Sequence, residues 1–327
     1  MPAEAASLAK ALLKPTLVST VVGLGSFGVA AIWEYETNEK NERKLKQKHE
    51  LEDDFSPNFD AVVEAETPPK PTQQQSPLRL FSPVIPDEYK AWWQDINQDP
   101  RAHTVGPLIV ADFAVGSLLS LSEMVMFGWK GDAKTRGQAF FRYTGSGRAL
   151  PVVVSPFGHG GLLHLGVTSV FVWKYGDHLV QKMGSRESFW AGFVTAGTIA
   201  TVGGILLDRI RNMVLPPPRV VFPKLKAPLV AFGAPYTVLY AYYFSCPEFQ
   251  DKVRHFHILG REFGVPVGDA VFGLVIVDLF GLALGHRVFG NGTHLSAAAI
   301  GYYATRMGGL QQIQQYQRFV VQQYAGK

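Results

Sequence analysis

Seven apolar segments, each long enough or nearly long enough to cross a bilayer, constrain this chain more than any other feature of its sequence. A membrane helix needs about 20 apolar residues, because about 30 Å of hydrocarbon is crossed at about 1.5 Å per residue. Backbone amides in lipid must be paired within their own segment, so we predict an all-α polytopic membrane protein. The segments are Leu17–Trp33, Pro107–Trp129, Val152–Trp173, Phe189–Leu207, Pro228–Ser245, Val267–Gly285 and Thr293–Met307.

The composition agrees with this prediction, since 47% of the residues are apolar and only 18% are charged. A large soluble enzyme with buried apolar helices is the alternative, but segments of membrane length recur here with basic loops between them. The net charge of +4 is too small and too scattered to indicate a nucleic-acid partner. The single cysteine, Cys246, excludes an internal disulfide framework and any multi-cysteine metal site. The distribution of Lys and Arg does not decide the membrane orientation.

Four regions follow from these patterns. Residues 1–37 form an N-terminal segment that carries the first predicted span. Residues 38–85 are polar and, in their later part, rich in Pro and Gln, which favours a flexible tether. Residues 86–310 form the membrane core, which opens with an interfacial amphipathic helix around Trp92 and Trp93. Residues 311–327 form a polar C-terminal tail.

Three stretches carry a resemblance to a known family. The run from Phe157 to Thr168, FGHGGLLHLGVT, is similar to the second core helix of the rhomboid intramembrane proteases. Asp278–Gly301, with DLFGLALG and then THLSAAAIG, resembles the last two core helices of that family. Leu13–Glu36 resembles the extra first helix of its mitochondrial, presenilin-associated branch. The resemblance implies a rhomboid-like six-helix core plus one extra N-terminal transmembrane helix, and a location in the mitochondrial inner membrane.

The resemblance also assigns roles to individual positions. His294 stands where the family has its catalytic histidine, while His164 and Thr168 stand on the oxyanion side, with Thr168 in place of an asparagine. The nucleophilic serine of the family's Gly-x-Ser-Gly motif falls on Phe232, or on Pro235 if the register is shifted. Neither side chain can attack a carbonyl, because covalent catalysis needs a hydroxyl or thiol beside its base. We therefore expect no catalytic residues, only vestigial positions.

Three other hydroxyls are candidate substitute nucleophiles for an active serine-type protease. Ser245 lies thirteen residues beyond Phe232, roughly 20 Å along a helix axis. Thr237 is about 7.5 Å along the axis from Phe232, but it is turned roughly 140° away. Ser296 is two residues from His294 on the same helix and points elsewhere. An active intramembrane protease with a non-standard nucleophile stays open as the alternative.

A metal site, an aspartyl protease and a transport protein are all disfavoured by the sequence. A zinc site from His159, His164 and His294 lacks the spacing that places two histidines on one helix face, so no metal and no cofactor is predicted. An aspartyl protease needs two paired carboxylates, and Asp278 has no partner motif, which favours a structural hydrogen bond. A channel or carrier is disfavoured by the absence of an inverted repeat in the sequence.

The sequence thus predicts an inactive rhomboid-like protein that binds rather than cleaves. Its expected partners are the lipid bilayer and a transmembrane protein, or a larger complex of the inner membrane in which it is an assembly factor or structural subunit.

Overall fold

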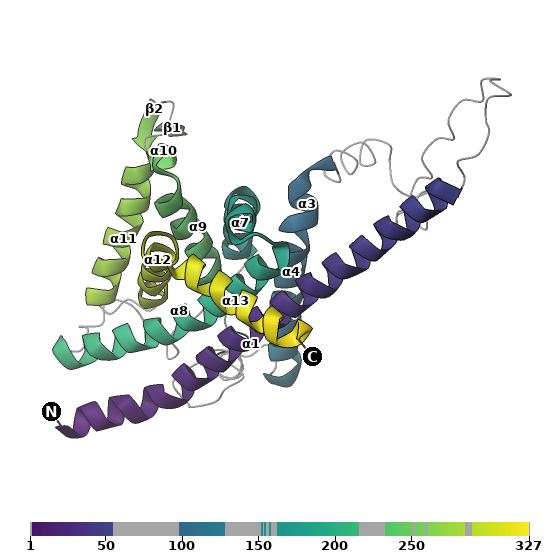
Figure 1. Ribbon diagram of the computed structural model, residues 1–327. Coiled ribbons are helices and arrows are strands. Elements are labelled where there is room, and N and C mark those ends of the chain that lie inside the picture. Colours follow the sequence, from purple (N-terminus) through teal and green to yellow (C-terminus); the bar gives the residue numbers. More distant parts are fainter. Residues whose placement is uncertain are drawn as a thin grey trace.

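The computed structural model describes residues 2–54, 98–127, 152, 154, 157, 162–215, 233–250, 253–258, 261–284 and 290–326. Figure 1 shows these residues as a helical bundle from which one end of α1 projects. The helices are α1 (Pro2–Asp54), α3 (Pro100–Thr104), α4 (Gly106–Phe127), α7 (Leu162–Met183), α8 (Arg186–Val214), α9 (Gly233–Ser245), α10 (Pro247–Gln250), α11 (Val267–Ala283), α12 (Asn291–Arg306) and α13 (Gly309–Ala325).

Each of the seven predicted spans overlaps one helix, namely α1, α4, α7, α8, α9, α11 and α12. The prediction of helices at these seven segments is thereby confirmed. One short addition was not predicted from the sequence: strands β1 (Val253–Ile258) and β2 (Arg261–Pro266) pair antiparallel, with Val253 opposite Pro266. This hairpin connects α10 to α11 at one end of the bundle (Figure 1).

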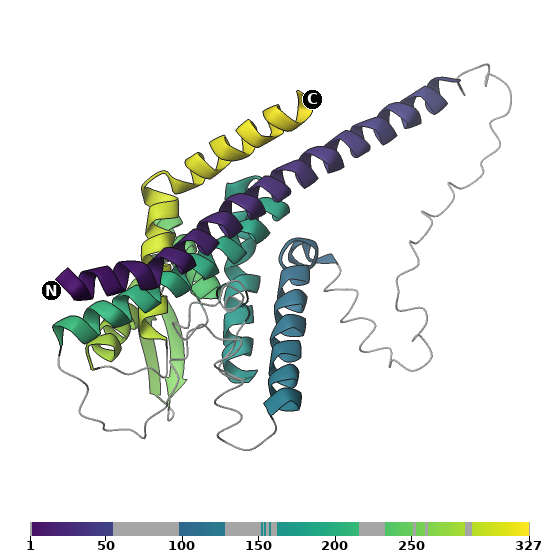
Figure 2. The ribbon, with the colours of Figure 1, turned by 90° about the horizontal axis from the view of Figure 1, so that it is seen from below.

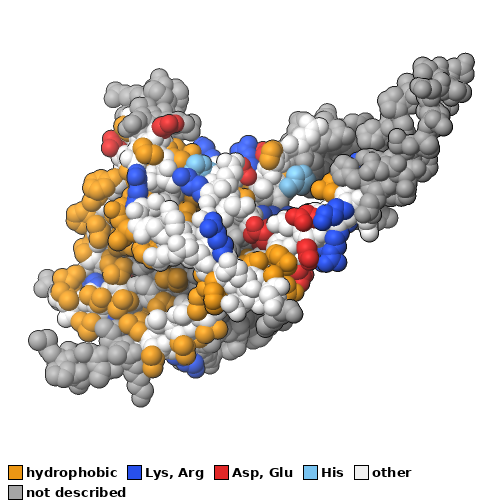
Figure 3. All heavy atoms as spheres, in the orientation of Figure 1, with side chains coloured by type: hydrophobic (Ala, Val, Ile, Leu, Met, Phe, Trp, Pro, Cys, Tyr) orange, Lys and Arg blue, Asp and Glu red, His pale blue; other side chains and the backbone are white. Residues whose placement is uncertain are grey.

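Two of the described helices are long and apolar enough to cross a bilayer by themselves: the Leu12–Lys48 part of α1 and all of α8. A shorter apolar helix runs over Gly106–Leu118 in α4. Large apolar side chains are also exposed on α11, where Phe272 and Phe280 are 64% and 65% accessible. Figure 3 shows apolar side chains gathered over α11 and α8, with charged side chains on the other side of this view. An exposed apolar surface of this kind is expected where helices face lipid.

Small residues allow the central helices α8, α9 and α12 to touch along their backbones. A Cβ atom at Gly204 of α8 would lie 2.7 Å from the backbone nitrogen of Thr293 in α12. A Cβ at Gly301, further along α12, would lie 2.8 Å from the backbone nitrogen of Ala241 in α9. Membrane helices gain little from hydrophobic association, so such close contacts supply much of their packing energy. The result fixes α12 tightly between α8 and α9.

The extra helix α1 packs antiparallel along α8, with Gly23 against Thr195 and Phe27 reaching Gly192. Helix α13 lies beside α1, as Figure 2 shows. Two hydrogen bonds join them: Tyr316 Oη donates to Leu24 O at 3.1 Å, and Tyr324 Oη donates to a Glu36 carboxylate oxygen at 2.8 Å. The segment predicted as a polar tail is thus a helix that holds α1 against the core.

The structure differs from the predicted tether, residues 38–85, in the first part of that range. Helix α1 continues to Asp54, so residues 38–54 are helical rather than irregular. Glu–Arg and Glu–Lys pairs four residues apart, such as Arg43 with Glu39 at 3.2 Å, favour helix here. Residues 55–85, including the Pro- and Gln-rich part, lie outside the described residues, as do Trp92 and Trp93.

Candidate functional site: a buried histidine and aspartate between three helices

The most distinctive polar pair in the described core joins α12 to α11. His294 Nδ1 lies 3.1 Å from Asp278 Oδ1, and the two residues are 5% and 4% exposed. Carboxylate oxygens only accept hydrogen bonds when ionised, so this contact favours the tautomer with the proton on Nδ1. The other ring nitrogen, Nε2, then carries the lone pair. A histidine held in this way by an acid has the geometry of a general base.

The start of α12 positions His294. Gly290 precedes the helix with φ 62°, a left-handed conformation that glycine adopts without steric cost. Its carbonyl accepts hydrogen bonds from the backbone nitrogens of Thr293 and His294, at 2.8 and 3.1 Å. Asn291 packs against Gly281 of α11, and Thr293 against Gly204 of α8. The first turn of α12 is therefore wedged between α8 and α11, which fixes the imidazole.

An aromatic ring covers the imidazole. Tyr236, in the first turn of α9, stacks on His294 with ring centroids 3.8 Å apart and an interplanar angle of 19°. Phe171 of α7 contacts Tyr236 edge to face, with centroids 5.9 Å apart. Three helices, α9, α11 and α12, thus meet at this histidine, and α7 packs behind Tyr236. Neither His294 Nε2 nor Tyr240 Oη, both buried, has a hydrogen-bond partner among the described residues.

The hydroxyls weighed as substitute nucleophiles lie in other contacts. Each of them donates a hydrogen bond to a backbone carbonyl of its own helix: Thr237 to Gly233 at 2.8 Å, Ser245 to Tyr242 at 3.0 Å and Ser296 to Gly292 at 2.8 Å. Within the described part of the chain, no hydroxyl is hydrogen-bonded to His294 Nε2. Phe232 lies outside the described residues, immediately before the first residue of α9.

The oxyanion-side positions both belong to α7. Thr168 is fully buried, and its hydroxyl donates to Leu165 O at 3.0 Å. The backbone of His164 is helical, while its side chain lies outside the described residues, as does all of His159. The structure therefore brings together His294 and Asp278, whereas the side chain of His164 and all of Phe232 lie outside the described residues. Among the described side chains, no group of three metal-binding residues lies close together.

Sequence reasoning found His294 but not its surroundings. Asp278 was expected to make a structural hydrogen bond, and its partner is His294, sixteen residues away. The stacking role of Tyr236 was missed, because one aromatic among the several of its segment carries no distinguishing signal. The only available sign was that an acid and a histidine occupy neighbouring apolar segments, where ionisable groups are costly.

A second polar contact lies at the other end of α9. Cys246 Sγ is 3.1 Å from His178 Nε2, which lies on α7 beyond the predicted span that ends at Trp173. Tyr242 packs edge to face on the imidazole, with centroids 5.1 Å apart. Burial lowers the pKa of His178, and the nearby ammonium of Lys182 lowers it further. The carboxylate of Asp177 opposes this shift only in part, so folding favours the neutral form of the imidazole relative to an exposed histidine.

Comparison with known proteins adds the family. A model of the rhomboid domain matches residues 146–310, half of the chain. The chain belongs to the rhomboid family. Its helical spans are therefore embedded in a lipid bilayer, and the pair of Asp278 and His294 lies within the matched region.

Individual relatives cover most of this rhomboid-family protein. Presenilin-associated rhomboid-like protein A, mitochondrial, from Danio rerio is 26% identical over 307 residues, which is 89% of this chain and 69% of the relative. The human and bovine presenilin-associated rhomboid-like proteins, mitochondrial, are each 25% identical over 304 residues, covering 91% of this chain and 67% of the relative. No solved structure matches the chain significantly.

Proposed function

We propose that this rhomboid-family protein binds a transmembrane partner without cleaving it, as an assembly factor or structural subunit of the mitochondrial inner membrane. The observation that carries the proposal is the state of the site: a histidine positioned by an acid, with no hydroxyl among the described residues bonded to its free nitrogen. In the family's register the nucleophile position falls on Phe232, whose ring has no attacking atom. The relatives named mitochondrial support the location.

The hydroxyl contacts argue against rescue of hydrolysis. Proton transfer to a general base requires heavy atoms within about 2.6–3.2 Å. Thr237 and Ser296 instead satisfy their hydroxyl protons on carbonyls one helical turn back, which is the usual arrangement of such residues in apolar helices. The geometry supports a fold retained from a protease and used for binding.

A cleavage assay tests the loss of hydrolysis. The full chain, purified in mild detergent, is incubated with generic rhomboid substrates beside His294→Ala. We expect equal background with both proteins. Cleavage by the wild type that disappears in His294→Ala would overturn the proposal.

We propose the exposed face of α11 as the docking site of the partner helix. Phe272, Val277 and Phe280 are more than 60% exposed there. A photo-crosslinking amino acid at Phe280 should capture one membrane protein in stoichiometric yield in mitochondria, whereas the same probe at Val29 of α1, which is 63% exposed, should not. Equal labelling of lipid alone at both positions would contradict partner binding at this face.

An active serine-type protease is the second candidate, and the intact pair of Asp278 and His294 favours it. It requires an attacking hydroxyl from Thr237, Ser245 or Ser296. Changing each to alanine separately in the same assay discriminates: loss of a measurable wild-type activity in one variant alone would identify the nucleophile.

A further inference from the structure

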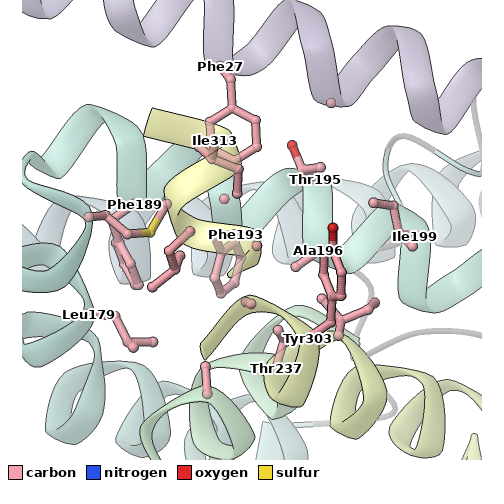
Figure 4. Close-up of a pocket in the computed structure, with 18 of the residues that line it drawn as sticks. Phe27, Leu179, Phe189, Phe193, Thr195, Ala196, Ile199, Thr237, Tyr303 and Ile313 are labelled. Atoms are coloured by element: carbon pink, nitrogen blue, oxygen red, sulfur yellow. The ribbon is translucent and has the colours of Figure 1, made fainter. Parts of the chain in front are cut away.

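A cavity that is separate from the histidine site opens between α1 and the core. Its volume is about 460 Å³, and α7, α8, α9, α12 and α13 complete its walls. Phe27 of α1 and Ile313 of α13 enter it from one side, and Thr237 of α9 lies on the other, as Figure 4 shows. Its lining is almost entirely apolar carbon, which suits an apolar occupant.

Two hydroxyls that line the cavity have no hydrogen-bond partner in the part of the chain that the structure describes. Ser19 Oγ of α1 and Thr195 Oγ1 of α8 belong to residues 4% and 8% exposed, and neither atom has a hydrogen-bond partner among the described residues. They lie on facing helices, since Gly23, one turn after Ser19, packs against Thr195. Other hydroxyls of these helices donate to their own backbone, for example Thr20 to Thr16 O and Thr198 to Thr195 O. A buried hydroxyl without a partner is unfavourable, so both call for an acceptor from a ligand.

The dimensions exclude a peptide helix as occupant. A helix about 10 Å across fills roughly 420 Å³ with every turn, so the cavity would hold only one turn. A single flexible apolar chain fits instead. Depth along α1 indicates which lipid group meets the hydroxyls: Ser19 lies five residues beyond the exposed Lys14, about 7.5 Å along the axis. This position is just below the polar boundary of the predicted span, where the ester carbonyls of a glycerophospholipid lie.

We propose that this cavity binds one acyl chain of a glycerophospholipid, with its ester carbonyl accepting hydrogen bonds from Ser19 and Thr195. From there the chain extends about 12 Å along α1 to Phe27, eight residues away. The lipid joins α1 and α13 to the core, at a site distinct from the pair of Asp278 and His294.

The test compares an ester-linked phosphatidylcholine with the ether-linked lipid of the same chains, which lacks the carbonyl. Binding to the delipidated full chain in mild detergent is measured by native mass spectrometry. We expect the wild type to bind the ester lipid about tenfold more tightly, which is about 1.4 kcal/mol. The double variant Ser19→Ala/Thr195→Val, which keeps the cavity volume, should bind both lipids equally.

Thr20→Val is the matched control, because Thr20 also lines the cavity but donates its hydroxyl to Thr16 O at 2.9 Å. It should keep the preference for the ester lipid. Ala196→Phe, which fills the cavity from α8, should abolish binding of both lipids. The proposal is overturned if the wild type does not distinguish the two lipids, if the double variant still does, or if Ala196→Phe binds as well as the wild type.

Discussion

Substitution by alanine should have opposite effects at Gly204 in α8, which contacts α12, and at Gly273 in α11, where an added Cβ meets nothing within 4 Å. Gly204 faces the backbone of α12, so a Cβ there would lie 2.7 Å from Thr293 N and 2.9 Å from its Cα. Backbone atoms cannot move aside as a flexible side chain can, and overpacking of this kind costs about 1–3 kcal/mol. Alanine recovers about 0.5–1 kcal/mol over glycine inside a helix. We therefore expect Gly204→Ala to destabilise the protein by up to about 2 kcal/mol.

Gly273 of α11 provides the matched control. A Cβ there meets no atom within 4 Å, so only the helix-propensity term applies. Gly273→Ala should stabilise the protein by about 0.5–1 kcal/mol. The two variants differ in chemistry by the same single methyl group, and their effects should have opposite signs.

Thermal unfolding of both variants in one detergent, followed by tryptophan fluorescence, measures the difference. A melting temperature of Gly204→Ala at or above that of the wild type would refute the close approach of α8 and α12. Because Thr293 precedes His294, the same displacement should also loosen the imidazole stack on Tyr236.

Three further predictions concern polar contacts outside the histidine site. The hydrogen bond to Glu36 raises the pKa of Tyr324 above the ordinary value of 10.0. In a titration followed by phenol absorbance, the pKa of Tyr324 should fall toward that value in Glu36→Gln. Identical titrations of the variant and the wild type would contradict the contact. The pKa of His178 is lowered below 6.5, so its contribution to stability is present above pH 6.5 and is lost as the pH falls through the pKa of the folded state. The variant His178→Gln should therefore show a smaller decline of melting temperature on acidification. An unchanged slope would show that this histidine is not a cause of the decline. Gln317 donates to Ser188 Oγ at 2.7 Å in a buried contact, so Gln317→Leu should destabilise the α13 attachment by about 1 kcal/mol, seen as faster hydrogen exchange in α13 with α12 unchanged.

The sequence predicted the membrane helices because their signal is local. Each apolar segment can be recognised from about 20 consecutive residues, without knowledge of the segments it contacts. The position that corresponds to the family's catalytic histidine could also be predicted, since His294 lies within a short recognisable motif. Local reasoning did not predict helix α13, because its many Gln residues are typical of a polar tail. The helix is held by contacts with a distant segment, α1, through Tyr316 and Tyr324.

The features of the site that the sequence does not predict depend on contacts between distant segments. The partner of His294 lies sixteen residues away on another helix, and the ring stacked on it lies 58 residues before it in the chain. The polar composition after Asn38 predicts a tether, whereas helix α1 continues to Asp54, because pairs of opposite charge four residues apart stabilise a helix here. Spacing alone cannot report which polar residues of an apolar helix face inward.

The pair of Asp278 and His294 also has a structural consequence that can be measured without any enzyme assay. Helix α11 exposes most of its apolar face, and hydrophobic association contributes little between helices in lipid, so a polar contact to α12 carries unusual weight. Asp278→Leu leaves the buried imidazole without its acceptor, at a cost of about 1–3 kcal/mol. Hydrogen exchange in α11 should then accelerate about 5- to 150-fold. Asp269→Asn, on the exposed first turn of the same helix, should leave that exchange unchanged, and equal rates in Asp278→Leu and the wild type would show that the pair does not hold α11 in place.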